Sequence, residues 1–290
     1  MSTILDTIAA ATRTRVQKEK ERLSTTDIKR RCAQAQEEID RQILGFETNQ
    51  ASRQLGNGLR FVDALAKPGL SFICEVKKAS PSKGVISEDF PYLEIARSYE
   101  EAGADCVSCL TEPQWFKGSD EIFREIRTAI DTPMIRKDFV VDEYQLYQAR
   151  LMGADAVLLI CAILDQQKLS RYLEITHELG MAALVETHDE EEIEQALEVG
   201  ARLIGVNNRN LHDFSVDFST SRRLRSLIPD DRIFVAESGV KGPEDIAAVA
   251  AMGADAVLVG EALMRSSDKS ATLEAMRQAS AKKFAGKVQG

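Results

Sequence analysis

The sequence is poor in several features that mark particular classes of protein. Its five cysteines are irregularly spaced, which argues against a disulfide framework and favours a reducing compartment. No apolar run approaches the roughly 18 residues that a membrane span needs. The amino-terminal stretch carries acidic residues early and lacks the apolar core of a secretory signal. We therefore expect a cytoplasmic protein with no membrane partner.

Positive charge is in the minority: 37 Lys and Arg stand against 46 Asp and Glu, for a net charge of −9. A chain without a basic excess is not expected to bind nucleic acid, although local cations can still bind a small anion. The three histidines are scattered, so no metal site is expected. Cys106 and Cys109 lie three apart in an apolar, strand-like run, which places them on opposite faces and predicts plain core cysteines.

One phrase recurs along the chain and indicates its architecture. It reads EAGADCVSCL at 101–110, LMGADAVLLI at 151–160, EVGARLIGVN at 198–207 and AMGADAVLVG at 251–260. Each copy combines a helix end, a glycine suited to the position after a helix, and a short apolar run suited to a buried parallel strand. The copies are spaced about 50 residues apart, as expected for a repeated supersecondary unit.

A second set of strand candidates interleaves with these copies. It comprises SFICEV (71–76), TPMIRK (132–137), GMAALVE (180–186) and DRIFVAES (231–238). Helical patterns fill the gaps at about 91–102, 119–130, 142–152, 165–179, 189–199, 217–227, 243–252 and 270–284. Eight strand–helix units predict a closed (β/α)8 TIM barrel. An open doubly wound sheet is less consistent with the sequence, because no GxGxxG turn follows the first strand.

The 290 residues fit one such domain with an extension. We expect a single domain over 1–290, with an N-terminal helical extension at 1–69 and the barrel at 70–290. The extension reads as strongly charged helix over about 4–43. It is expected either to cap the barrel or to cover a substrate, and the two roles are compatible. No large apolar surface is evident, so a monomer is expected.

Active sites of such barrels lie at the carboxyl ends of the strands, and several strands here end in polar side chains. The first ends in Glu75 and Lys77, the third in Lys137, the fifth in Glu186, the sixth in Asn207 to Arg209, and the seventh in Glu237 and Ser238. A structural ion pair between Glu75 and Lys77, or a solvated Lys137, is the alternative reading of these positions. Their repetition at one rim favours a catalytic site.

Glu186 has no Lys or Arg beside it in the sequence, so we expect a raised pKa that suits acid–base work. A carboxylate that caps a loop is the alternative. His188, two residues on, is interpreted as a surface side chain. The loops after the last two strands contain Gly239 and Gly260, which can offer backbone N–H groups to a phosphate, and Arg209 can add a bidentate contact.

At this point the sequence resembles a known family. The motifs ICEVKKASPSKG, LTEPQWFKGS, PMIRKDFVVDEYQ, ALVETH, IGVNNRNL, VAESGV and VLVGEALMR occur in the order found in the indole-3-glycerol-phosphate synthases. The resemblance spans about residues 1–285. It implies ring closure of 1-(2-carboxyphenylamino)-1-deoxyribulose 5-phosphate, with loss of CO2 and water, in tryptophan biosynthesis. It implies no metal and no organic cofactor.

The resemblance also implies residue roles. Lys137 would be the general acid at the ketone oxygen, Glu186 the base of the later steps, and Lys77 the contact for the substrate carboxylate. The remaining polar positions implied are Glu75, Asn207, Glu237 and Ser238. The implied phosphate contacts are Ser80, Arg209, Gly239, Gly260 and Glu261, the last through its backbone only. Phe116 and Phe139 would form the apolar walls around the ring.

Two other functions are compatible with the barrel. Another phosphosugar enzyme, an isomerase or an aldolase, could use Lys137 as a Schiff-base amine. A non-catalytic scaffold would bind phosphate but would not need Lys137 and Glu186 together. The helical extension and the KKASPSKG loop argue against the first of these.

Overall fold

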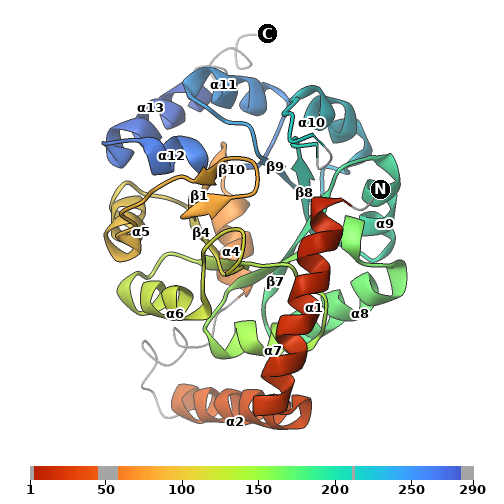
Figure 1. Ribbon diagram of the computed structural model, residues 1–290. Coiled ribbons are helices and arrows are strands. Elements are labelled where there is room, and N and C mark those ends of the chain that lie inside the picture. The colour runs from red at the N-terminus through yellow and green to blue at the C-terminus, as the bar shows by residue number, and fades with distance from the viewer. Residues whose placement is uncertain (1–2, 45–57, 211–212, 282–290) are drawn as a thin grey trace.

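The computed structural model describes residues 3–44, 58–210 and 213–281. Eight parallel strands close into a barrel in the order β1-β10-β9-β8-β7-β6-β5-β4, with helices outside it (Figure 1). The strands are β1 (Ser71–Val76), β4 (Cys106–Leu110), β5 (Met134–Lys137), β6 (Ala156–Ile160), β7 (Ala182–Thr187), β8 (Leu203–Asn207), β9 (Ile233–Glu237) and β10 (Ala256–Val259). The predicted (β/α)8 barrel is confirmed.

The predicted outer helices are also present, within a few residues of their expected bounds. They are α5 (Tyr92–Glu101), α6 (Asp120–Ala129), α7 (Tyr144–Leu151), α8 (Gln166–Glu178), α9 (Glu190–Glu198), α10 (Ser219–Leu224), α11 (Pro243–Ala251) and α13 (Lys269–Ala281). The predicted end of the last helix, beyond residue 281, lies outside the described residues. Short 3-10 helices, η1 (Cys161–Ile163) and η2 (Arg225–Leu227), follow β6 and α10.

The recurring phrase works as a turn from helix to strand. Its glycine has a positive φ in every copy, from 77° at Gly103 to 80° at Gly153, a conformation that residues with a Cβ rarely adopt. Where the phrase reads GAD, the aspartate then binds the start of the preceding strand. Asp105, Asp155 and Asp255 accept a backbone N–H from the first or second residue of β1, β5 and β9. The donors are Phe72, Met134 and Phe234, at 2.8 to 2.9 Å. The repeat therefore ties each new strand to the one before it.

Alternate residues of the strands contribute to two separate cores. One fills the barrel and includes Cys106, Leu158 and Leu258, and the other lies between the strands and the outer helices and includes Cys109 and Val157. Cys106 and Cys109 are both buried and lie in different cores, which confirms that they are plain core residues. The alternation decides which side chain of each strand end can reach the barrel mouth.

The N-terminal helices contact both ends of the barrel. Helix α1 (Ile4–Arg22) crosses the barrel mouth, α2 (Thr25–Leu44) packs on α7, and α4 (Gly58–Leu65) contacts β1, β4 and β7 (Figure 1). Ion pairs fix α1 and α2 to the segment after β5: Arg15–Asp138 at 2.7 Å, Lys20–Asp142 at 2.6 Å and Lys29–Glu143 at 2.6 Å. The division at residue 69 into an extension and a barrel stays a prediction.

Two small elements were not expected from the sequence. Strands β2 (Ala79–Ser80) and β3 (Gly84–Val85) pair antiparallel and turn the loop after β1 into a short hairpin. Helix α12 (Glu261–Arg265) stands directly after β10. Both lie beside the barrel mouth, where they shape the loops. Within the described part of the chain, no helix has the length and apolar character needed to cross a bilayer.

Candidate active site

A cavity of about 1040 Å³ opens at the carboxyl ends of the strands. All the site residues expected from the sequence line it except Glu237, which is buried behind Lys137. They are Glu75, Lys77, Ser80, Phe116, Lys137, Phe139, Glu186, Asn207, Arg209, Ser238, Gly239, Gly260 and Glu261. Residues from seven strand ends and the loops after them therefore meet in one place.

Two lysines and three carboxylates form the charged floor of this cavity. Lys137 Nζ lies 3.1 Å from Glu237 Oε2 and 3.8 Å from Glu186 Oε2. Lys77 forms a close ion pair with Glu75. Both lysine side chains are only 15% exposed, so these charges interact through little water and their attraction is stronger than at a surface.

The alternation of the strand explains why Lys137, and not its neighbour Arg136, is in the cavity. Arg136 points outward, donates to Gln145 O at 2.9 Å, and pairs with Asp120 at 2.9 Å. Burial works to lower the pKa of Lys137, but the carboxylates of Glu237, Glu186 and Glu75 together raise it above its ordinary value. Lys137 is therefore a charged ammonium group, and its 15% exposure argues against the alternative of a solvated lysine.

The two carboxylates beside Lys137 have opposite pKa shifts. Burial raises the pKa of Glu237 to about 7, and the Lys137 cation only partly offsets this. For Glu186, burial is overcome by contacts with His188, Lys137 and Asn207, and the pKa is lowered to about 2. The sequence-based expectation of a raised pKa for Glu186 is therefore wrong, because its cationic neighbours are distant in sequence or were interpreted as surface residues.

The prediction that His188 lies at the surface is also wrong. Its side chain is only 15% exposed and sits between two carboxylates, with Nε2 3.4 Å from Glu186 Oε1 and Nδ1 3.0 Å from Glu192 Oε2. The spacing from Glu186 to His188 gave a signal, since residues two apart on an extended segment point the same way. The sequence did not show that the first turn of α9 would supply Glu192.

The opposite side of the cavity carries positive charge and unusual backbone. Arg209 donates to Phe214 O at 3.1 Å, which fixes its guanidinium beside the cavity. Ser238 and Gly239 both have positive φ, 65° and 100°, and a Cβ on Gly239 would overlap Val216. Lys83, Lys241 and Arg265 line the same side. This gathering of cations is suited to an anionic group such as a phosphate.

Gly260 and Glu261 stand where β10 meets α12. A Cβ on Gly260 would overlap the Glu75 carboxylate and lie 2.9 Å from Lys77 Nζ, so the missing side chain makes room for that ion pair. The Glu261 carboxylate pairs with Arg265 at 3.0 Å and with Lys83 at 4.0 Å. Its negative charge is thereby partly neutralised.

An apolar wall faces the charged floor. The rings of Phe116 and Phe139 lie with their centroids 6.1 Å apart. The Glu112 carboxylate accepts the backbone N–H groups of residues 114 to 116, at 2.7 to 3.0 Å, and so holds the loop that carries Phe116. Helix α1 adds Ile4, Leu5 and Ile8 to the cavity lining. These α1 residues were missed, because the sequence does not say which end of the barrel a flanking helix covers.

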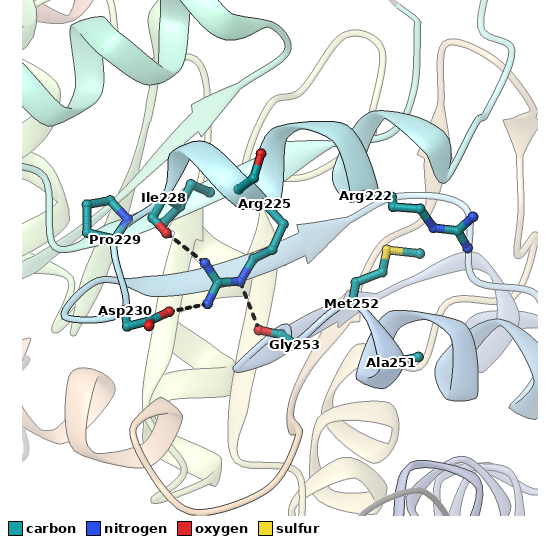
Figure 2. Close-up of a pocket in the computed structure, with 9 residues that line it drawn as sticks. Arg222, Arg225, Ile228, Pro229, Asp230, Ala251, Met252 and Gly253 are labelled. Atoms are coloured by element: carbon teal, nitrogen blue, oxygen red, sulfur yellow. Dashed lines mark hydrogen bonds and ion pairs between the residues drawn. The ribbon is translucent and has the colours of Figure 1, made fainter.

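A second cavity, of about 720 Å³, lies at the ends of α10 and α11, near the starts of β9 and β10 (Figure 2). Its central side chain, Arg225, donates to Gly253 O at 3.2 Å and to Ile228 O at 2.6 Å, and pairs with Asp230 at 2.9 Å (Figure 2). The guanidinium therefore joins the segments around it. This cavity contains none of the predicted site residues.

Comparisons with known proteins agree with this geometry. The family model described as indole-3-glycerol phosphate synthase matches residues 5–276. The chain is 47% identical over 274 residues to the indole-3-glycerol phosphate synthase of Ruminiclostridium cellulolyticum, covering 94% of this chain and 98% of that protein. It is 50% identical over 263 residues to that of Endomicrobium trichonymphae, covering 91% and 95%.

Solved structures that resemble it in fold are more distant in sequence. The tryptophan synthase alpha chain of Legionella pneumophila has a TM-score of 0.58 at 16% identity, covering 77% of this chain and 97% of that one. The 3-hexulose-6-phosphate synthase of Salmonella typhimurium has a TM-score of 0.57 at 13% identity, covering 73% and 99%. These structures share the barrel, while the family model and the relatives identify the chain's own group. The chain belongs to the indole-3-glycerol phosphate synthase family.

Proposed function

We propose that the cavity at the barrel mouth closes the pyrrole ring of indole glycerol phosphate from 1-(2-carboxyphenylamino)-1-deoxyribulose 5-phosphate. In this reaction the ring carbon that bears the carboxylate attacks the ketone carbon. The carboxylate leaves as CO2, and its bonding electrons restore the aromatic ring. The hydroxyl formed from the ketone then leaves as water, together with a proton from the neighbouring carbon.

Lys137 is assigned as the acid that protonates the ketone oxygen. It is buried at the centre of the cavity floor, 3.1 Å from Glu237, and surrounding carboxylates raise its pKa. An ammonium group held in a dry, preorganised site stabilises a developing alkoxide far better than one in water. This ion-paired ammonium group is the observation that carries the proposal. It argues against a Schiff-base aldolase, which needs a neutral amine.

Lys77 is assigned to the decarboxylation and Glu186 to the dehydration. Lys77, paired with Glu75 under Gly260, would bind the substrate carboxylate until CO2 leaves. Glu186, kept ionised by its neighbours, would take the proton that leaves during dehydration. Asn207 donates to Glu186 Oε1 at 3.1 Å and orients it.

The substrate phosphate is assigned to the cationic side of the cavity. Arg209 would form the charged contact, with Ser80 and the backbone at Gly239, Gly260 and Glu261. Phe116 and Phe139 would hold the anthranilate ring against the apolar wall. The carboxylate and the phosphate of the substrate would then lie at two separate cations, Lys77 and Arg209.

We also propose that the chain works as a monomer in the cytoplasm and without a nucleic-acid partner. All five cysteines are buried and free, which suits a reducing compartment. Large exposed apolar side chains in the described ranges are isolated ones, namely Leu59, Val85 and Leu227. Sedimentation of the purified protein would test the monomer, and a dimer peak would contradict it.

Turnover of the authentic substrate tests the proposed reaction. We expect the purified protein to release CO2 and to form the fluorescent indole product in equal molar amounts. A phosphosugar isomerase would give neither signal. A folded protein that binds the substrate but releases no CO2 would contradict the proposal and leave a phosphate-binding role.

A further inference from the structure

His188 and Glu192 do not line the substrate cavity, but His188 contacts Glu186, which does. Glu192 is in the first turn of α9, and its Oε2 accepts the backbone N–H of His188 at 2.8 Å as well as facing His188 Nδ1 at 3.0 Å. The N-cap residue Asp189 accepts the Glu192 N–H at 2.9 Å. The His188 ring is thus fixed from behind by the start of a helix.

The other ring nitrogen faces the carboxylate that the reaction uses. His188 Nε2 lies 3.4 Å from Glu186 Oε1, a distance longer than an ordinary hydrogen bond and typical of a close ion pair. Burial works to lower the pKa of His188, but Glu186 and Glu192 raise it to about 10. The ring is therefore an imidazolium at neutral pH.

The two oxygens of Glu186 have different surroundings. Oε1 faces His188 and accepts from Asn207 Nδ2 at 3.1 Å. Oε2 faces Lys137 Nζ at 3.8 Å and is the oxygen nearest the acid of the reaction. Oε1 therefore accepts a hydrogen bond from Asn207 and faces the His188 ring, while Oε2 is left for chemistry.

We propose that Glu192 and His188 form a two-residue relay that holds Glu186 ionised, fixes its Oε1 together with Asn207, and leaves Oε2 as the oxygen that accepts the proton. This inference rests on the proposed role of Glu186 as the base. His188 and Glu192 are positioning residues, since neither lines the cavity. The arrangement has the logic of other sites where a buried carboxylate orients an imidazole toward a reacting group.

Other charged groups around Glu186 set the pH at which it acts. Lys137 supports its ionised form, whereas Glu237 on β9 and Glu75 on β1 oppose it. The Cys161 thiol, whose pKa burial raises well above its ordinary value, stays neutral. Losing the His188 cation leaves Glu186 with Lys137 as its cationic neighbour, and this shifts the balance toward protonation of Glu186.

Replacement of His188 by asparagine tests the relay. We expect the pKa of the Glu186 carboxyl, followed by carboxyl-carbon NMR, to rise by about one unit or more, because loss of a nearby cation raises a carboxyl pKa by that order. We expect kcat to fall about tenfold or more with KM little changed, since the base is disturbed and the binding cations are not. Glu192→Gln should give a smaller shift in the same direction. His177→Asn, on α8 away from the cavity, is the matched control.

The double variant His188→Asn, Glu192→Gln adds a stricter requirement. If Glu192 acts through His188, the double variant should be no slower than His188→Asn alone. Additive losses, or a lower kcat with an unchanged Glu186 pKa, would overturn the relay and leave a purely structural role for His188.

A second measurement separates this inference from the proposed function. Ring-nitrogen NMR of the folded protein reports the charge of His188 without any turnover, with the His188→Asn spectrum identifying its signals. We expect an imidazolium at neutral pH in the wild type and a lower pKa in Glu186→Gln. A neutral His188 ring at pH 7 would overturn the relay even if the enzyme closes the ring. A charged ring in a protein that does not turn over the substrate would instead contradict the proposed function.

Discussion

Replacing Lys137 by methionine removes the ammonium group and keeps an unbranched side chain of similar length. In the structure this takes away the cation 3.1 Å from Glu237 and 3.8 Å from Glu186. We expect kcat for ring closure to fall by about 10²–10⁴, the range for one positioned acid. At roughly 1.4 kcal/mol per tenfold change, that raises the barrier by about 3 to 5 kcal/mol.

A second substitution separates proton donation from charge alone. Lys137→Arg keeps a cation near the two carboxylates, but a guanidinium does not release its proton at neutral pH. If Lys137 donates the proton to the ketone oxygen, Lys137→Arg should be about as slow as Lys137→Met. If the lysine were only a counterion, arginine would restore much of the rate.

The assay is the rise of indole fluorescence after mixing each variant with saturating substrate. Lys168→Met is the matched control, because Lys168 is 54% exposed and pairs with Asp165, the N-cap residue of its own helix α8. Thermal melts establish that each variant is folded. A folded Lys137→Met protein with kcat within about threefold of the wild type would refute the acid role, since that loss is far below the range for an acid.

Three further predictions concern packing, the extension and pH. Gly260→Ala should lower kcat and Tm, because the new Cβ would overlap the ion pair beneath it. Gly242→Ala, which has no neighbour within 4 Å, should leave kcat unchanged. Arg15→Met breaks the 2.7 Å ion pair that holds α1 to the segment after β5. We expect faster hydrogen exchange in α1 and a fall of about 1–3 kcal/mol in the free energy of unfolding. Arg30→Met, in an exposed pair, should change it little, and equal effects of the two substitutions would contradict the prediction. Burial raises the pKa of Glu237 from an ordinary 4.5 to about 7, so the wild type loses stability as pH rises through that window. The Tm of Glu237→Gln relative to the wild type should therefore increase between about pH 5 and about pH 8, and a pH-independent difference would count against it.

Strand and helix positions could be predicted because they depend on local signals. The repeated phrase marks each helix end with a glycine, and each phrase continues into a buried parallel strand. Strand β1 occupies the residues predicted for it, 71–76. The hairpin β2–β3 and the helix α12 were not expected, because two-residue strands and a five-residue helix leave too short a pattern to recognise.

Candidate site residues could be predicted because every parallel strand of a barrel ends at the same rim. Lys137 and Glu186 were identified in this way, and both line the cavity. Their charge states could not be predicted, because the pKa of a buried group depends on neighbours that folding brings together. Glu186 and Lys137 are separated by more than forty residues in the sequence, and their side chains lie 3.8 Å apart.

The sequence by itself determined the eight units, their order along the chain and the polar side chains at five of the strand ends, since these follow from periodicity and chain direction. Only the tertiary structure decided that Lys137 faces the cavity while Arg136 faces outward, that α1 covers the mouth, and that His188 joins Glu186 to Glu192. The physical reason is that burial and electrostatic interaction depend on distance through space. Such distances are fixed by barrel closure and helix packing, which no local pattern contains.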